Sequence, residues 1–165
     1  MAEVSRDRII VLDDMIDPKD LEIIEYSPAV MANVKNGKLE EVYTSLKKNE
    51  GNFRVYLKAD IPERYHLKNH YRVPEFLVVA ELGYTINTRE FFGARTGYPS
   101  GGAHGFDNKE REMYGIFLAN GPDIKEGFQM KAFESVHLYA LMAHLMDVKP
   151  VETDGSLDSI KVIMQ

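Results

Sequence analysis

The chain has 165 residues, no cysteine and a formal net charge of −6. This length fits one domain of ordinary size that buries a core without disulfides, and the lack of cysteine excludes thiolate metal sites. The charge is spread along the chain, which argues against a nucleic-acid-binding surface because such a surface needs clustered Lys and Arg. No apolar run reaches the roughly 18 residues of a membrane span, so we expect no such span.

Residues 26–58 carry the pattern of a strand, a helix and a second strand. "SPAVMANV" is typical of a strand and ends just before a turn signal at Asn36 and Gly37. "FRVYLK" alternates like a half-buried strand. Between them, four apolar residues of "KLEEVYTSLKKN" recur at i, i+3, i+4 and i+7, which predicts one face of an amphipathic helix: Leu39, Val42, Tyr43 and Leu46.

The segment "IPERYHLKNHYRVP", residues 61–74, is bounded by prolines and rich in charge, so it predicts a surface loop. "FLVVAEL" follows as a continuous apolar run, which indicates a strand covered on both faces in a parallel sheet. "MYGIFLA" has the same pattern, and "ESVHLYALMAHLMDV" has the length and apolar content of a packed helix. The alternation of strands and helices predicts an α/β fold.

His104 stands among glycines in "SGGAHGFDNKEREMYGIFLANGP", between the two expected strands "FLVVAEL" and "MYGIFLA". Glycines on both sides let a ligand or metal approach closely, and a side chain at the rim of a sheet can face a ligand. A simple turn explains the same letters. Asp107, followed three residues later by Glu110, is likewise consistent with the cap of a short helical turn.

The other histidines have simpler explanations. His66 and His70 are four residues apart, but flanking prolines disfavour a helix there and the glutamate of a zincin motif is missing. We expect them to be solvated loop residues. His137 and His144 are seven residues apart on the expected helix, where we expect structural roles.

Four stretches, in order, resemble the C-terminal half of the type I phosphodiesterase/nucleotide pyrophosphatase family of the alkaline phosphatase superfamily. They are "VLDDMID", "IPERYHLKNHYRVPEFLVVAELGYTI", "GGAHGFDNKEREMYGIFLANGP" and "ESVHLYALMAHLMDVKPVETDGSLD". The resemblance implies that residues 1–165 form one partial domain. In it, a strand–helix–strand subdomain at 26–58 stands beside a portion, 75–165, that completes an alkaline-phosphatase-like core.

The resemblance implies a hydrolase that cleaves phosphodiester or pyrophosphate bonds through a covalent threonine intermediate, with two zinc ions. Two metal ions suit this chemistry because one activates the attacking oxygen and the other stabilises the leaving oxygen. His104 matches the family's last metal-ligand histidine. The resemblance implies that the substrate of the complete enzyme is a nucleotide or a phospholipid phosphodiester, and that the complete enzyme is secreted, periplasmic or at the cell surface, as family members are.

The family's threonine and its other aspartate and histidine ligands have no counterparts in this chain. The last of these ligands belong to a D-H-G-M motif whose methionine matches Met1. One histidine cannot hold a catalytic zinc, which takes about three protein ligands, so we expect the chain alone to be inactive. Three interpretations remain: a truncated enzyme whose partner is its missing N-terminal half, a subunit of a split enzyme, or a non-catalytic binding module.

Overall fold

The computed structural model describes residues 1–67 and 70–165, which form two compact units, Met1–Tyr114 and Gly115–Gln165. Each unit has its own hydrophobic core. The assignment of residues 1–165 to one partial domain stays a prediction, because the compactness of each unit does not decide whether both belong to one domain.

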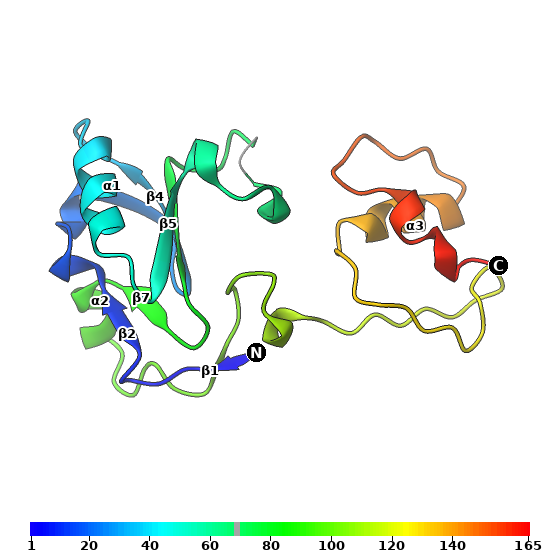
Figure 1. Ribbon diagram of the computed structural model, residues 1–165, viewed down its shortest axis with the longest axis horizontal. Helices are drawn as coiled ribbons and strands as arrows, with labels where there is room; N and C mark the ends of the chain where they lie inside the picture. Colours follow the sequence, from blue (N-terminus) through cyan, green and yellow to red (C-terminus); the bar gives the residue numbers. More distant parts are fainter. Residues whose placement is uncertain (68–69) are drawn as a thin grey trace. The chain divides into compact units, whose positions relative to one another are not determined.

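The N-terminal unit is built around a four-stranded antiparallel sheet with the strand order β3-β4-β6-β5 (Figure 1). These strands are β3 (Leu21–Glu25), β4 (Ala29–Val34), β5 (Phe53–Leu57) and β6 (Phe76–Ala80). The strand that comes last in the sequence, β6, therefore lies between β4 and β5. The expected strands "SPAVMANV", "FRVYLK" and "FLVVAEL" are confirmed as β4, β5 and β6.

Strand β6 is buried along its whole length because both of its faces are covered. Phe76, Val78 and Ala80 contribute to the main core, whereas Leu77 and Val79 point to a second cluster with Ile61 and Val73 from the loop of residues 61–74. The expectation of a parallel sheet here is wrong, since β6 pairs antiparallel with both neighbours. An apolar run records burial on two faces, and burial is the same for either strand direction.

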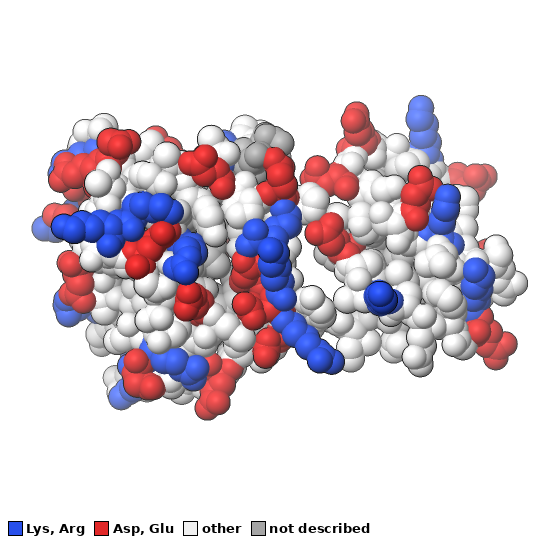
Figure 2. Space-filling view, viewed as in Figure 1, with Lys and Arg blue, Asp and Glu red and all other residues white. Residues whose placement is uncertain are grey.

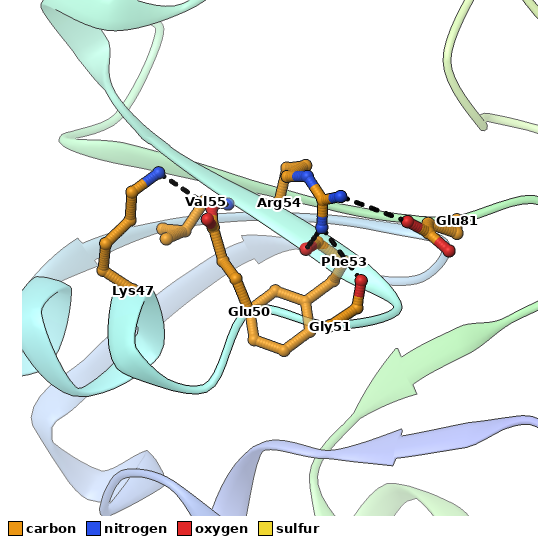
Figure 3. A network of polar contacts seen from close by, with 7 residues as sticks. All are labelled: Lys47, Glu50, Gly51, Phe53, Arg54, Val55 and Glu81. Carbon is orange, nitrogen blue, oxygen red and sulfur yellow. Dashed lines mark hydrogen bonds and ion pairs between the residues drawn. The ribbon is translucent and has the colours of Figure 1, made fainter.

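Helix α1 (Leu39–Lys48) covers the main-core face of this sheet, as the apolar spacing predicted. Its buried residues Val42 and Leu46 belong to the main core, and Leu39 and Tyr43 pack against the same cluster from its edge. The strand–helix–strand order of β4, α1 and β5 is therefore confirmed. A polar network follows the end of α1 and links Lys47, Glu50 and Arg54 to their surroundings (Figure 3).

Two small sheets complete the N-terminal unit. Strands β2 (Ile9–Val11) and β7 (Thr85–Asn87) are parallel, and β1 (Ala2–Glu3) and β8 (Gly102–Ala103) are antiparallel. Helix α2 (Arg89–Gly93) follows β7, with the Thr88 side chain as its N-cap. Short 3-10 helices connect these elements: Leu12–Asp14, Pro18–Asp20, Lys58–Asp60, Glu63–Tyr65 and Arg111–Met113.

The C-terminal unit contains helix α3 (His137–Leu145) and the 3-10 helices Leu157–Ser159 and Lys161–Ile163. Its core consists of Leu141, Ile160 and Ile163 with partly buried neighbours. The expected helix in "ESVHLYALMAHLMDV" is confirmed as α3.

The expected strand "MYGIFLA" is wrong, because these residues form a 3-10 end and an extended coil. Ile116 and Leu118 are 91% and 89% exposed, so the apolar run is not buried among the described residues. The pattern alone did not distinguish a buried strand from an exposed apolar segment.

The loop expected at residues 61–74 is confirmed in its described part, where the only regular structure is one 3-10 helix, Glu63–Tyr65; residues 68–69 lie outside the described residues. No helix in the described ranges has both the length and the apolar character to cross a membrane. On the face shown in Figure 2, acidic and basic side chains are interspersed.

Candidate functional site

His104 follows β8 directly and is exposed to solvent. Its imidazole forms no hydrogen bond or ion pair with any residue in the described part of the chain. Glycines flank it at positions where the backbone is left-handed, with φ of 80° at Gly101 and 94° at Gly105. The histidine therefore presents two ring nitrogens to solvent from a sharply turned segment. His104 was expected in a loop between two strands. This prediction is wrong for the second strand, because "MYGIFLA" does not form one.

The backbone on both sides of His104 is fixed by packing. Upstream, Ala103 pairs with Ala2 of β1, and the Val4 N–H donates to the Gly101 carbonyl at 3.0 Å. Downstream, Phe106 is 6% exposed and packs in a small cluster with Ala2 and Val4. The segment is thus anchored while the imidazole itself remains accessible.

A second anchor joins this segment to the loop of residues 61–74. The Arg64 guanidinium forms two hydrogen bonds to the Asp107 carboxylate, one from Nε at 3.2 Å and a short one from Nη2. The Asn108 side-chain amide donates to the Arg64 carbonyl at 2.8 Å. Three hydrogen bonds therefore connect residues that lie more than 40 positions apart in the sequence.

Charge and burial act in opposite directions on Asp107. Burial disfavours the ionised carboxyl, but hydrogen bonds from Arg64, the Lys109 N–H and Tyr65 outweigh it and hold the pKa of Asp107 below its usual range. Burial raises the pKa of Tyr65 well above its usual range, and the hydrogen bond with Asp107 raises it further. Asp107 is therefore an anion and Tyr65 a neutral phenol at neutral pH.

A cavity of about 380 Å³ lies beside this anchor. Its polar lining consists of Arg54, Tyr56, Tyr65, Glu81, Asp107 and Glu110. Arg54 is occupied by neighbours, since its Nη1 donates to the carbonyls of Gly51 and Phe53 and its Nη2 lies 3.4 Å from Glu81 (Figure 3).

Arg64 and Asn108 were not predicted as site residues. Arg64 stands in a segment whose composition indicates only a charged loop, and for its partner Asp107 the cap of a short helical turn was one open alternative. The Asp107 carboxylate does accept from the Lys109 N–H at 3.0 Å, but it also accepts two hydrogen bonds from the Arg64 guanidinium. The pairing depends on the fold, so no local signal could have revealed it.

The other histidines have different surroundings. His66 has a left-handed backbone at the end of a 3-10 helix, and the His70 Nδ1 accepts from the Arg72 N–H at 3.2 Å. The Nδ1 atom of His137 accepts from the Ser156 N–H at 3.0 Å, which is a structural role. His144 is exposed in the last turn of α3.

An exposed imidazole without a protein partner suits zinc, which histidine nitrogen binds at about 2.0–2.1 Å. Residues 1–67 and 70–165 bring together no group of three or more His, Cys, Asp or Glu side chains that would hold a metal ion. A catalytic zinc takes about three protein ligands. His104 therefore fits as one donor, and the described residues do not complete a site.

A family model for type I phosphodiesterase/nucleotide pyrophosphatase matches residues 1–107. Human ectonucleotide pyrophosphatase/phosphodiesterase family member 7 is 38% identical over 144 residues, which are 86% of this chain and 30% of the relative. Mouse bis(5'-adenosyl)-triphosphatase enpp4 is 31% identical over 164 residues, which are 99% of this chain and 34% of that protein. The chain thus spans about a third of the length of these relatives.

Solved structures agree with the family model. Human ectonucleotide pyrophosphatase/phosphodiesterase 5 matches with a TM-score of 0.86 and 33% identity, over 98% of this chain and 42% of that one. An inactive threonine-to-alanine variant of the murine protein, in complex with AMP, matches with a TM-score of 0.83 and 33% identity, over 99% of this chain and 42% of that one.

The fold is therefore the mixed α/β architecture of the alkaline-phosphatase-like hydrolases, as expected. Within that class, the chain belongs to the type I phosphodiesterase/nucleotide pyrophosphatase family.

Proposed function

We propose that this chain is the C-terminal part of a zinc-dependent phosphodiesterase or nucleotide pyrophosphatase, and that His104 is one ligand of a catalytic zinc ion. The observation that carries the proposal is the exposed imidazole, which has no hydrogen-bond or ion-pair partner among the described residues and stands on a segment anchored at both sides. The His137 imidazole, by contrast, accepts a hydrogen bond from the Ser156 N–H.

The rest of the active site comes from the missing N-terminal half of the same enzyme. The described residues contain no three-ligand cluster, and the relatives are about three times as long as this chain. When bound, zinc polarises the phosphoryl group and activates the attacking oxygen. The contribution of this chain is an imidazole nitrogen held in a fixed place. A threonine nucleophile in the absent half is supported by the inactive threonine-to-alanine variant of the murine relative.

The substrate of the complete enzyme is a nucleotide phosphodiester or pyrophosphate. Two relatives support this choice: the mouse protein named as a bis(5'-adenosyl)-triphosphatase, and the murine structure in complex with AMP. A phospholipid phosphodiester is the competing substrate, and a direct comparison separates the two. The p-nitrophenyl ester of a nucleoside monophosphate should be hydrolysed at least ten times faster than p-nitrophenyl phosphocholine, and the reverse order would overturn the nucleotide assignment.

The first experiment uses the chain alone. It should neither bind zinc tightly in equilibrium dialysis nor hydrolyse the nucleoside p-nitrophenyl ester, because a single histidine does not make a catalytic site. Metal-dependent hydrolysis by the chain alone would overturn the proposal of an incomplete enzyme.

The second experiment supplies the N-terminal part of a family relative, fused or as a separate chain. Metal-dependent hydrolysis should return. In this restored enzyme His104→Ala should lose zinc and most activity, whereas His66→Ala and His137→Ala should keep both. Full zinc content and rate in His104→Ala would exclude the ligand role. A folded assembly that never hydrolyses the ester would favour a non-catalytic binding module instead.

A further inference from the structure

We propose that Arg64 is a positioning residue for His104: it fixes the segment of residues 104–108 through Asp107 and Asn108. The inference rests on the proposed ligand role of His104, and it adds a second, distant residue to that site.

Arg64 holds the segment with both its side chain and its backbone. The guanidinium makes two hydrogen bonds to Asp107, one of them at 3.2 Å, and the Arg64 carbonyl accepts from the Asn108 side chain at 2.8 Å. Paired guanidinium–carboxylate bonds fix orientation as well as distance. The ion pair is only about a quarter exposed, with side-chain exposures of 26% for Arg64 and 27% for Asp107, so water competes with it less than with a surface pair.

The base of this anchor is packed on a hydrophobic cluster. Arg64 lies between Ile61, which is 1% exposed, and Tyr65 and Leu67, which pack on the same hydrophobic cluster. That cluster covers one face of β6 through Leu77 and Val79. The Arg64 guanidinium also stacks over the Tyr65 ring, 4.6 Å from its centroid. Arg64 therefore connects the segment that carries His104 to the four-stranded sheet.

His104 needs such a fixed support. Its side chain forms no hydrogen bond or ion pair with the residues that the structure describes, and Gly105 on one side lets the backbone turn at φ 94°. Without the Arg64 side chain, the described contacts that still hold the downstream side of the turn include the packing of Phe106 in its small cluster and the Tyr65 hydrogen bond to Asp107. Metal ligands must lie close to their bound geometry before the ion arrives, and the residues that orient them affect affinity strongly.

The first test measures hydrogen exchange in this chain. Arg64→Ala should raise amide exchange at residues 104–108 by about tenfold or more, while exchange in β6 stays unchanged. Arg89→Ala is the matched control, because Arg89 also pairs with a distant aspartate, Asp14, but is 65% exposed. Unchanged exchange at residues 104–108 in Arg64→Ala would overturn the proposal.

The second test measures zinc affinity in the enzyme restored with its N-terminal part. Arg64→Ala should weaken zinc binding by roughly 10-fold, the lower end for residues that orient a ligand. Arg64→Lys should recover part of the loss because it keeps the charge but not the paired geometry. Arg89→Ala should bind zinc normally. The denaturation midpoint of each variant shows whether a loss of affinity reflects general unfolding.

The two proposals fail in different ways. If His104→Ala loses zinc while Arg64→Ala binds it normally, the positioning role is wrong and the ligand role stands. If His104→Ala keeps its zinc, the ligand role fails and the positioning role fails with it, whatever the exchange rates show. Asp107→Ala should cost less when it is added to Arg64→Ala than when it is made in the unmodified chain, because the pair with Arg64 is then already lost. A fully additive loss would contradict the coupling.

Discussion

Glu50 accepts a hydrogen bond from the backbone N–H of Val55 at 2.8 Å (Figure 3). The same carboxylate oxygen accepts from the Lys47 ammonium at 3.0 Å. Glu50 therefore joins the end of α1 to β5 across the turn between them, and only 19% of its side chain is exposed.

Replacing Glu50 should destabilise the N-terminal unit. Glu50→Ala leaves the Val55 N–H without its acceptor, which costs about 1–3 kcal/mol for a desolvated donor. Glu50→Gln keeps an acceptor oxygen and should cost less. The control is Lys47→Ala, which removes only a surface ion pair worth about 1 kcal/mol or less. Urea denaturation followed by circular dichroism measures each value. A Lys47→Ala loss as large as that of Glu50→Ala would mean that the ion pair, not the backbone bond, carries the effect.

The Arg64–Asp107 pair predicts a dependence of stability on acid pH. The pKa of Asp107 in the folded protein lies below its ordinary 3.8, because the hydrogen bonds outweigh burial. An unfolded aspartate has a pKa of about 3.9. The stabilisation is therefore complete above that value and is lost as the pH falls through the lower, folded pKa.

Asp107→Asn should remove this part of the acid sensitivity. At neutral pH the variant should be less stable by about 1.5–3 kcal/mol, the range for hydrogen bonds to a charged group. The difference from the unmodified chain should shrink as the pH falls below about 3.9, the pKa of an unfolded aspartate. Free energies of unfolding measured over this range check it, and a constant difference would show that Asp107 is not the titrating partner.

Alanine substitutions at two glycines near α1 distinguish the cost of backbone strain from the cost of crowding. Gly37 has φ 68° and Gly51 has no such left-handed angle, and an added Cβ meets nothing within 4 Å at either position. Gly37→Ala should therefore cost about 1–2 kcal/mol from strain alone. Gly51→Ala should be neutral or stabilising by up to about 1 kcal/mol, since it restricts the unfolded chain. Thermal unfolding distinguishes them, and equal melting temperatures would contradict the strain argument.

The exposed apolar segment after Tyr114 should make the chain alone associate with itself. Ile116 and Leu118 are 91% and 89% exposed, and contiguous exposed apolar side chains favour association. Ile116→Asp combined with Leu118→Asp should raise the monomer fraction in analytical ultracentrifugation without lowering the melting temperature. Val151→Asp, at a 70% exposed position elsewhere in the C-terminal unit, is the control. If the unmodified chain stays monomeric at high concentration, the exposed segment does not drive self-association.

The correctly predicted elements are those in which the spacing of apolar residues follows the buried face of the helix or strand. The i, i+3, i+4, i+7 spacing from Leu39 to Leu46 exists because one face of α1 packs on a sheet. The run at residues 76–80 indicated a strand covered twice, and α1 and the loop of residues 61–74 do cover it. The parallel pairing predicted for this strand was wrong, because side-chain hydropathy does not depend on whether neighbouring strands run parallel or antiparallel.

The candidate site was only partly predictable for a similar reason. His104 was found because glycines and a family resemblance mark it locally. Arg64 was missed because its role arises from a contact across 43 positions that only the folded backbone creates. Ile116 and Leu118 were wrongly assigned to a buried strand, because the hydropathy of a side chain does not determine whether the fold buries it.

The central position of β6 also has a consequence for the time course of folding. During synthesis β4 and β5 leave the ribosome before residues 76–80 do, yet β6 is the strand that both of them pair with. Until it emerges, the two inner strand edges have no partner and can pair with other chains. Sheet closure must also bring together residues far apart in sequence, which slows folding. The nascent chain therefore passes through a vulnerable interval that ends only when β6 inserts.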